Sequence, residues 1–380
     1  MTDFLRRLPD GGVQGAKKRS IWQAIHLDPI LLGLIYAILG LGIFVLVSAS
    51  DGSAYFVKRQ IAFACIGSIA MIVVAQISTG LMRRWILPLY LVGIVLLILV
   101  IFVGSGAKGA QRWIDLGFFS FQPSELIKLT LPVMLAAYLS SGPIPPTFGR
   151  VMFALVLIIV PMALVLQQPD LGTGLLIAAA GAIVLFLAGL RWIYIVSAFV
   201  VMLVTVPLFW FYLMHEYQRQ RVLTLFNPEA DRLGAGWNII QSKTAIGSGG
   251  WSGKGWLEGT QSHLEFLPER QTDFIIAVLA EEFGMRGVLI LLCLYFLFAV
   301  RGLFISLAAK NAFARMTSGA ITFTLFVYVF VNMGMVSGIL PVVGVPLPLV
   351  SYGGTSLVSL FIGFGVLMAI ATEEQKLTDN

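Results

Sequence analysis

One carboxylate, Asp273, stands where a polar segment of the sequence gives way to an apolar run. The segment is Glu265-Phe-Leu-Pro-Glu-Arg-Gln-Thr-Asp273-Phe-Ile-Ile-Ala, and no Lys or Arg follows Asp273 at the third or fourth position. A charged group at the boundary between water and hydrocarbon is costly and is usually functional. Asp273 is therefore our candidate for a general base or a metal ligand. Helix capping by Thr272 or Asp273 is the competing interpretation.

The residues after Asp273 predict a narrow helical face of small side chains. At helical spacing this face contains Asp273, Ala277, Ala280 and Gly284, which leaves room beneath the carboxylate for a substrate or a neighbouring helix. Two acids lie deeper in the same run, and Arg286 follows the second of them, Glu282, by four positions. We expect either Glu281 or Glu282 to have a structural partner.

A second pair of ionisable residues, Glu125 and Lys128, opens another apolar run. They are three positions apart, so they share a helical face and can form an ion pair. Ionisable groups in an apolar helix normally face the interior of a helical bundle, which predicts a charged cavity wall. The alternative is a purely structural pair, with Ser124 as the helix cap.

Asp170 occupies the short connection Gln167-Gln-Pro-Asp170 between two further apolar runs. Capping of the helix that follows would by itself explain this aspartate. Several basic residues precede or follow these acids and could bind a phosphate group. The full set of candidates for substrate binding or for a cavity wall is Glu125, Lys128, Lys108, Arg112, Asp170, Lys243, Glu269 and Arg270.

The composition around these residues lies far outside that of soluble domains. Of the 380 residues, 58% are hydrophobic and 12% are charged, and the mean hydropathy is +0.91. We predict an all-α polytopic membrane protein of about ten transmembrane helices, with one helical domain at 30–372 and tails at 1–29 and 373–380. The ten apolar runs lie near 30–48, 60–77, 85–103, 125–140, 151–166, 171–189, 192–213, 273–300, 316–336 and 354–372.

The distribution of Lys and Arg predicts the orientation of these helices. With both termini in the cytoplasm, the inner segments carry thirteen basic residues and the outer loops carry four, apart from six in the long loop 214–272. That loop is close to the length at which the positive-inside rule no longer applies. We expect it to lie outside, between helices seven and eight, and both tails to be cytoplasmic. The formal charge of +6 then reflects topology, and no nucleic acid is expected as a partner.

Two connecting segments are predicted to be more than passive links. The loop 214–272 contains the glycine-dense run 245–255, where backbone could approach a ligand closely, although a flexible exposed loop is the alternative. The apolar segment 338–354 is interrupted by three prolines. Such backbone survives at membrane depth only when protein covers it or it lines a cavity, so we predict a re-entrant element on the outer side. Asn332 precedes it and is expected to pack between helices.

Taken together, these motifs resemble the SEDS family (shape, elongation, division and sporulation). The resemblance covers residues 30–372 and is greatest for the elongation branch, with the division branch as the alternative. The matching motifs are Gln111-Arg-Trp-Ile, Phe121-Gln-Pro-Ser-Glu-Leu-Ile-Lys, Gln168-Pro-Asp-Leu-Gly-Thr, Lys243-Thr-Ala-Ile-Gly-Ser-Gly-Gly, Leu267-Pro-Glu-Arg-Gln-Thr-Asp-Phe and Pro348-Leu-Val-Ser-Tyr-Gly-Gly-Thr-Ser. Thr355 stands where the family often has Ser.

The resemblance implies a ten-helix peptidoglycan glycosyltransferase of the bacterial cytoplasmic membrane, which polymerises lipid II into glycan strands. It also implies a class B penicillin-binding protein, a transpeptidase, as partner. The essential aspartate of the family corresponds to Asp273, its cavity acid and lysine to Glu125 and Lys128, and the aspartate of its Gln-Pro-Asp motif to Asp170.

In the predicted reaction, Asp273 is the general base for the attacking sugar hydroxyl. The leaving pyrophosphate needs positive charge, from a divalent cation such as Mg²⁺ or Mn²⁺ or from the basic residues Lys108, Arg112, Lys243 and Arg270. Other expected partners are the nascent glycan strand and membrane lipid. A flippase for lipid-linked sugars, or a non-catalytic scaffold for the penicillin-binding protein, are the alternative functions.

Overall fold

The computed structural model describes residues 22, 25–104, 112–115, 117, 120–214, 216–231, 235–260 and 269–373. Within these ranges the chain is almost entirely helical, with one short antiparallel ribbon formed by β1 (Ile114–Asp115) and β2 (Ser120–Phe121). The candidate residue Lys108 lies outside the described residues.

Within the described residues, ten apolar helices coincide one for one with the ten predicted runs. Eight of these helices are long and apolar enough to cross a membrane, when α8 is counted together with the π-helical turn that continues it to Tyr212. The other two are α5, with 18 residues, and α7, with 17. The chain is therefore a multi-pass membrane protein, as predicted. The helices are α2 (Pro29–Ala49), α3 (Ala54–Ala75), α4 (Thr79–Val103), α5 (Pro123–Ser140), α6 (Phe148–Gln167), α7 (Leu171–Leu187), α8 (Trp192–Leu208), α12 (Ile275–Ala308), α13 (Ala312–Val336) and α14 (Gly354–Thr372).

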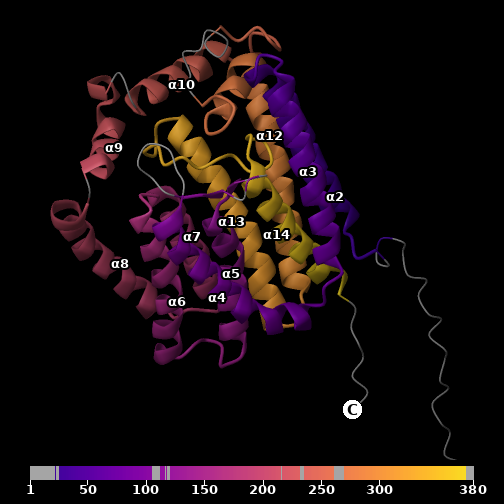
Figure 1. Cartoon of the computed structure of the whole chain (residues 1–380), viewed down its shortest axis with the longest axis vertical. Coiled ribbons are helices and arrows are strands. Elements are labelled where there is room, and N and C mark those ends of the chain that lie inside the picture. The colour runs from indigo at the N-terminus through magenta and orange to yellow at the C-terminus, as the bar shows by residue number, and fades with distance from the viewer. Residues whose placement is uncertain are drawn as a thin grey trace, which may run out of the picture.

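Helix α13 lies at the centre of the bundle. Figure 1 shows it between the group α4 to α7 and the group formed by α2, α3, α12 and α14. It contributes to the hydrophobic core of both groups and is more enclosed than the other candidate spans, with 61% of its most apolar window buried. By contrast, α8 and the π-helical turn that continues it (Phe209–Leu213) lean away from the bundle, and no residue of α8 is buried.

The segment 214–272 is not a simple loop. It forms α9 (Glu216–Phe226), a 3-10 turn (Pro228–Asp231) and α10 (Ala235–Gly249), and α10 packs against α12. The glycines at 249 and 253 allow the backbone of this segment to lie directly against the backbone of α12. A Cβ atom on Gly249 would lie 1.9 Å from the carbonyl oxygen of Ala280, and one on Gly253 would lie 2.1 Å from that of Glu282. We expected the glycine run 245–255 to approach a ligand, but in the structure its glycines at 249 and 253 pack against α12.

These glycines dock onto a break in α12. Gly284 has φ of 63°, which interrupts the helix and frees the backbone groups on either side of it. The amides of Lys254 and Gly255 donate to the carbonyls of Glu281 and Glu282, both at 3.0 Å, and the amide of Met285 donates to the carbonyl of Gly250 at 3.0 Å. These hydrogen bonds give partners to the amides and carbonyls that the break in α12 leaves without helical partners, as buried backbone groups require.

The break and the helix start correct two expectations. The predicted helical face cannot continue to Gly284, because that residue is not helical. The residue at the N-cap of α12 is Phe274, and no side chain caps the helix. The prediction that Thr272 or Asp273 caps this helix is wrong, so capping does not explain the carboxylate of Asp273.

The contact between Gly249 and α12 predicts that the substitution Gly249→Ala destabilises the protein. The new methyl group would overlap main-chain atoms, which cannot rotate away, and overpacking of this kind costs about 1–3 kcal/mol. Gly247→Ala is the matched control, because a Cβ at Gly247, also in α10, would have no neighbour within 4 Å. We expect the thermal midpoint in detergent to fall for Gly249→Ala and to be unchanged or higher for Gly247→Ala. Equal midpoints for the two variants would contradict the described packing.

Candidate active site

The turn that carries Asp273 is anchored to the connection between α2 and α3. The amides of Thr272 and Phe274 donate to the carbonyl of Glu269 at 3.0 and 3.4 Å. Arg270 is buried and forms an ion pair with Asp51, which follows the end of α2. Arg270, which the sequence suggested as a substrate-binding residue, therefore has an anchoring contact in the structure.

Asp273 lies among charged groups from three elements. Burial raises the pKa of its carboxyl from 3.8 to about 7, and the negative charge of Glu269 acts in the same direction. The guanidinium of Arg221 in α9 opposes the shift, while the carboxylate of Asp170 before α7 adds to it. Asp273 thus changes its charge near neutral pH, which is the range that suits a general base.

Asp170, before α7, is the third acid of the region. Its carboxylate accepts a hydrogen bond from the amide of Thr173 at 3.3 Å, so it caps α7 as predicted. The guanidinium of Arg112 lies 3.7 Å from the same carboxylate and also donates to the carbonyl of Gln168 at 3.3 Å. Asp170 interacts electrostatically with Lys128 as well as with Asp273.

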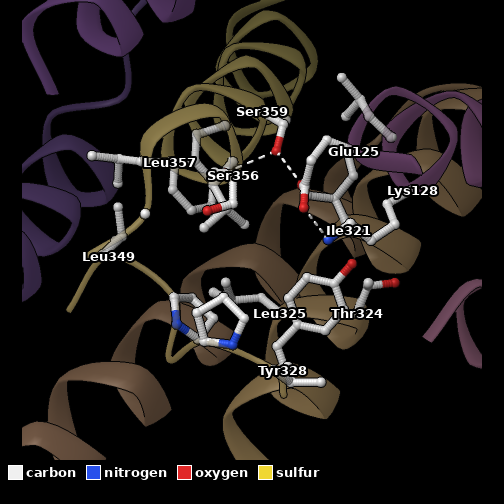
Figure 2. A pocket seen from close by; sticks show the side chains of 18 of the residues that line it. Glu125, Lys128, Ile321, Thr324, Leu325, Tyr328, Leu349, Ser356, Leu357 and Ser359 are labelled. Carbon is white, nitrogen blue, oxygen red and sulfur yellow. Dashed lines mark hydrogen bonds and ion pairs between the residues drawn. The ribbon is translucent and has the colours of Figure 1, made fainter. Parts of the chain in front are cut away.

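The ion pair of Glu125 and Lys128 is present, with 2.5 Å between Oε1 and Nζ. Both side chains are largely buried, and Ser359 of α14 donates to Oε2 of Glu125 at 2.8 Å. Figure 2 shows the pair facing Tyr328 and Thr324 of α13 across a small cavity. The predicted cap by Ser124 is wrong, because the N-cap position of α5 is Gln122 and no hydrogen-bond partner of the Ser124 hydroxyl is found among the described residues.

The cavity beside this pair has a volume of about 80 Å³. Helices α5, α13 and α14 form three of its walls, and residues 345–353 form the fourth. The lining is mainly apolar, but the buried hydroxyl of Thr324 has no hydrogen-bond partner in the described part of the chain. A volume of this size holds a few water molecules and is well below the roughly 300–1,000 Å³ of pockets that enclose small ligands.

The segment 338–353 contacts both the cavity and the Asp273 turn, since residues 345–353 line the cavity and a Cβ on Gly344 would lie 3.5 Å from Oδ2 of Asp273. It contains no regular helix, and its residues Val345, Leu347, Leu349 and Val350 are buried. The predicted irregular backbone covered by protein is confirmed. The segment also packs against the start of α7, since a Cβ on Gly172 would lie 2.4 Å from the carbonyl oxygen of Val343. The ends of α5, α7 and α12 therefore meet around this segment.

The sequence model of the cell cycle protein family FtsW/RodA/SpoVE matches residues 21–376 of this chain. The chain belongs to this family. The peptidoglycan glycosyltransferase MrdB of Escherichia coli K12 is 52% identical over 363 residues, which cover 96% of this chain and 98% of MrdB. The resemblance to the SEDS family inferred from the motifs is thereby confirmed.

Two solved structures share the fold. A chain in the structure of a peptidoglycan synthase complex, described as coordinating polymerization and crosslinking, matches with a TM-score of 0.81 at 31% identity over 91% of this chain and 97% of that one. The rod shape determining protein RodA of Thermus thermophilus matches with a TM-score of 0.69 at 29% identity over 91% of this chain and 96% of RodA.

In this member of the FtsW/RodA/SpoVE family, the structure brings together most of the residues that the sequence proposed. Asp273, Glu269, Asp170, Arg112 and the Glu125–Lys128 pair form one charged region. The exposed Lys243 of α10 packs over Gly338, where a Cβ would lie 2.6 Å from its Nζ.

Three polar residues near the charged region were not predicted from the sequence: Arg221, Ser359 and Tyr328. Each lies on a different helix from the acid or base that it approaches, so no local spacing relates them. The polar character of α9, with three basic or acidic residues in its first six, is the one sequence signal that could have pointed to Arg221.

Within the described ranges, no group of three or more His, Cys, Asp or Glu side chains is placed to hold a metal ion. The carboxylates of Glu269 and Asp170 act on Asp273 through their charge. This donor set suits at most a cation that arrives with a phosphate ligand, because Mg²⁺ is commonly bound by one or two carboxylates plus substrate phosphates.

The buried pair predicts a non-additive response to mutation. Glu125→Gln leaves the ammonium of Lys128 buried without its carboxylate, and breaking one side of a buried ion pair costs about 3 kcal/mol. The double variant Glu125→Gln with Lys128→Met removes both charges and should recover a large part of the lost thermal stability. Thermal midpoints of the wild type, both single variants and the double variant measure this coupling. Additive losses would show that the pair contributes no interaction energy.

Proposed function

We propose that this chain is a peptidoglycan glycosyltransferase that polymerises lipid II into glycan strands, and that Asp273 is its general base. The 52% identity to MrdB over nearly the whole of both chains supports the activity. The observation that supports the role of Asp273 is its position in a turn where burial, together with the negative charge of Glu269, raises its pKa to about 7.

The reaction transfers a glycosyl group from a lipid pyrophosphate to a sugar hydroxyl. The hydroxyl oxygen forms a bond to the anomeric carbon while the bond from that carbon to the pyrophosphate oxygen breaks. The carboxylate of Asp273 takes the hydroxyl proton, and the lipid pyrophosphate leaves with the bonding electron pair. A base positioned within about 3 Å of the hydroxyl typically contributes a factor of about 10²–10⁴ to the rate.

The leaving pyrophosphate carries negative charge that the protein must stabilise. Arg221 and Arg112 are the basic residues that the structure associates with Asp273 and Asp170 respectively, so we assign them to the pyrophosphate. Lys128 is engaged by Glu125 and supports the cavity wall. A divalent cation belongs to the proposal only as a counter-ion carried by the pyrophosphate, and no step of the mechanism depends on it.

The cavity beside Glu125 and Lys128 is too small to hold a disaccharide. Its 80 Å³ suits water, so the sugars of the substrate must lie on the side of segment 338–353 that carries Asp273, or the cavity must open. A polyprenyl tail requires an apolar surface, and the helices present such surfaces to lipid along their length. We therefore place the sugars at the Asp273 turn and the tail between the helices and the membrane.

Location and partnership follow from the same proposal. Both termini are assigned to the cytoplasm, because the inner segments then hold thirteen basic residues against four in the outer loops other than 214–272. The Asp273 turn then faces the outside of the bacterial cytoplasmic membrane. The likeness to a chain of a synthase complex that couples polymerization with crosslinking supports a class B penicillin-binding protein as partner. The names MrdB and RodA favour a role in elongation over one in division.

The role of Asp273 predicts that Asp273→Asn abolishes polymerisation. The amide keeps the shape of the carboxyl group but cannot accept the proton, so the rate should fall by about 100-fold or more. Glycan chain length is measured with purified protein, its partner and lipid II. Glu216→Gln is the control, because the side chain of Glu216 is 83% exposed and its charge is not among those that shift the pKa of Asp273. Wild-type polymerisation by Asp273→Asn, with the partner still bound, would rule out this assignment.

The same experiment separates the alternative functions. A flippase would move lipid II across a vesicle bilayer without lengthening it, and its activity would not produce glycan strands. A scaffold would produce no strands in the absence of an active polymerase and would be insensitive to Asp273→Asn. Strands that require the wild-type carboxylate support the enzyme.

The raised pKa of Asp273 predicts an acid limb in the pH profile. The base form exists above the pKa, so activity should be full at about pH 8 and fall as the pH drops through about 7. An aspartate with its ordinary pKa of 3.8 would instead leave activity unchanged down to about pH 5. The measurement is the initial rate of polymerisation between pH 5 and 9, with stability checked at each value. A flat profile over that range would contradict the raised pKa of Asp273.

A further inference from the structure

Three successive backbone carbonyls of the Asp273 turn are each held by a donor from another part of the chain. The amide of Tyr352 donates to the carbonyl of Gln271 at 2.9 Å, and the hydroxyl of Ser351 donates to that of Thr272 at 2.5 Å. The side-chain amide of Asn332 donates to the carbonyl of Asp273 itself at 2.9 Å. We call these three hydrogen bonds the carbonyl clamp.

Asn332 links the clamp to the segment that borders the cavity. Its side-chain nitrogen donates a second hydrogen bond, at 2.7 Å, to the carbonyl of Val345, so both protons of the amide are used. Asn332 is fully buried in α13, and Ser351 is 4% exposed. Ser351 also accepts from the amide of Leu347 at 2.8 Å, which ties the segment to itself. The clamp residues Asn332 and Ser351 are therefore buried, and their further hydrogen bonds fix the orientation of both side chains.

Helix α12 supplies no cap that would hold the turn before it. The helix begins only at Ile275, and no side chain caps its start, so the turn before it is not held by helical hydrogen bonds. The ion pair of Arg270 with Asp51 fixes one end of the turn. The clamp fixes the other end, at the residue that carries the carboxylate.

We infer that Asn332 and Ser351 are positioning residues for polymerisation, which hold the backbone of residues 271–273 so that the carboxylate of Asp273 meets the acceptor hydroxyl. This inference rests on the proposed function of Asp273. Neither residue touches the reacting atoms, and both act through the backbone of the turn. A displacement of about 1 Å in a catalytic group can lower a rate by about 100-fold, so a loosened turn should affect turnover more than substrate binding.

The test compares three serine variants in polymerisation assays with lipid II and the partner. Ser351→Ala removes the donor to Thr272 and should lower kcat about 10-fold or more with little change in KM. Ser351→Thr keeps the hydroxyl and should recover most of kcat. Ser242→Ala is the matched control, because the buried Ser242 hydroxyl donates to the carbonyl of Val336 at 2.8 Å, outside the turn. Its kcat should stay close to that of the wild type.

Amide hydrogen exchange gives a second reading that does not depend on activity. Ser351→Ala should accelerate exchange in residues 269–274, and Ser242→Ala should not. Where Ser351→Ala fails to fold, Asn332→Asp takes its place, since it has the same shape without the donating amide. Wild-type kcat and unchanged exchange in the variant that folds, or an equal loss of kcat in Ser242→Ala, would overturn the inference.

The outcomes also separate this inference from the proposed function. If Asp273→Asn polymerises normally, the proposed base is wrong, while the exchange data still report on the clamp. If Asp273→Asn is inactive but Ser351→Ala and Asn332→Asp keep wild-type kcat, only the positioning role fails.

Discussion

The structure depends on one constraint, that backbone amides and carbonyls removed from water must find partners within the protein. Helices meet it along most of the chain. Where a helix is broken at Gly284, the glycine run of 249–255 supplies the missing partners. Where the chain is irregular before α12 and after α13, residues 271–273 and 345–352 bond to each other and to Asn332. The irregular segments are therefore mutually dependent.

That dependence gives the protein a rigid place for a carboxylate at the end of a helical bundle. A helix cap would have used the side chain of Asp273 to satisfy amides. Because α12 begins without such a cap, the carboxylate of Asp273 does not bond to the amides of the helix. The backbone of the turn is held instead by Asn332 and Ser351. Burial and the charges of Glu269, Arg221 and Asp170 then set its pKa near 7. The same segments that satisfy the backbone thus surround a carboxyl group whose pKa lies near 7.

The sequence predicted the features that depend on local spacing. The ten predicted apolar runs are ten helices in the structure. Glu125 forms an ion pair with Lys128, three residues away, and Asp170 caps the helix that it precedes. It did not predict contacts between distant residues. Asn332 bonds to a carbonyl 59 positions away, and Ser351 to one 79 positions away. Asn332 was predicted to pack between helices, and the glycine run 245–255 was predicted to approach a ligand. In both cases the local sequence does not show which distant backbone the residue contacts.

We propose that Asp273 accepts the proton of the acceptor hydroxyl, and a structure of the chain and its partner with a lipid pyrophosphate donor and a glycan acceptor would show the reacting atoms. We expect the carboxylate to lie within about 3 Å of the attacking hydroxyl. We also expect the pyrophosphate to lie on the side of Arg221 and Arg112. An acceptor hydroxyl more than about 6 Å from Asp273, with a different carboxylate within hydrogen-bond reach, would contradict the proposal.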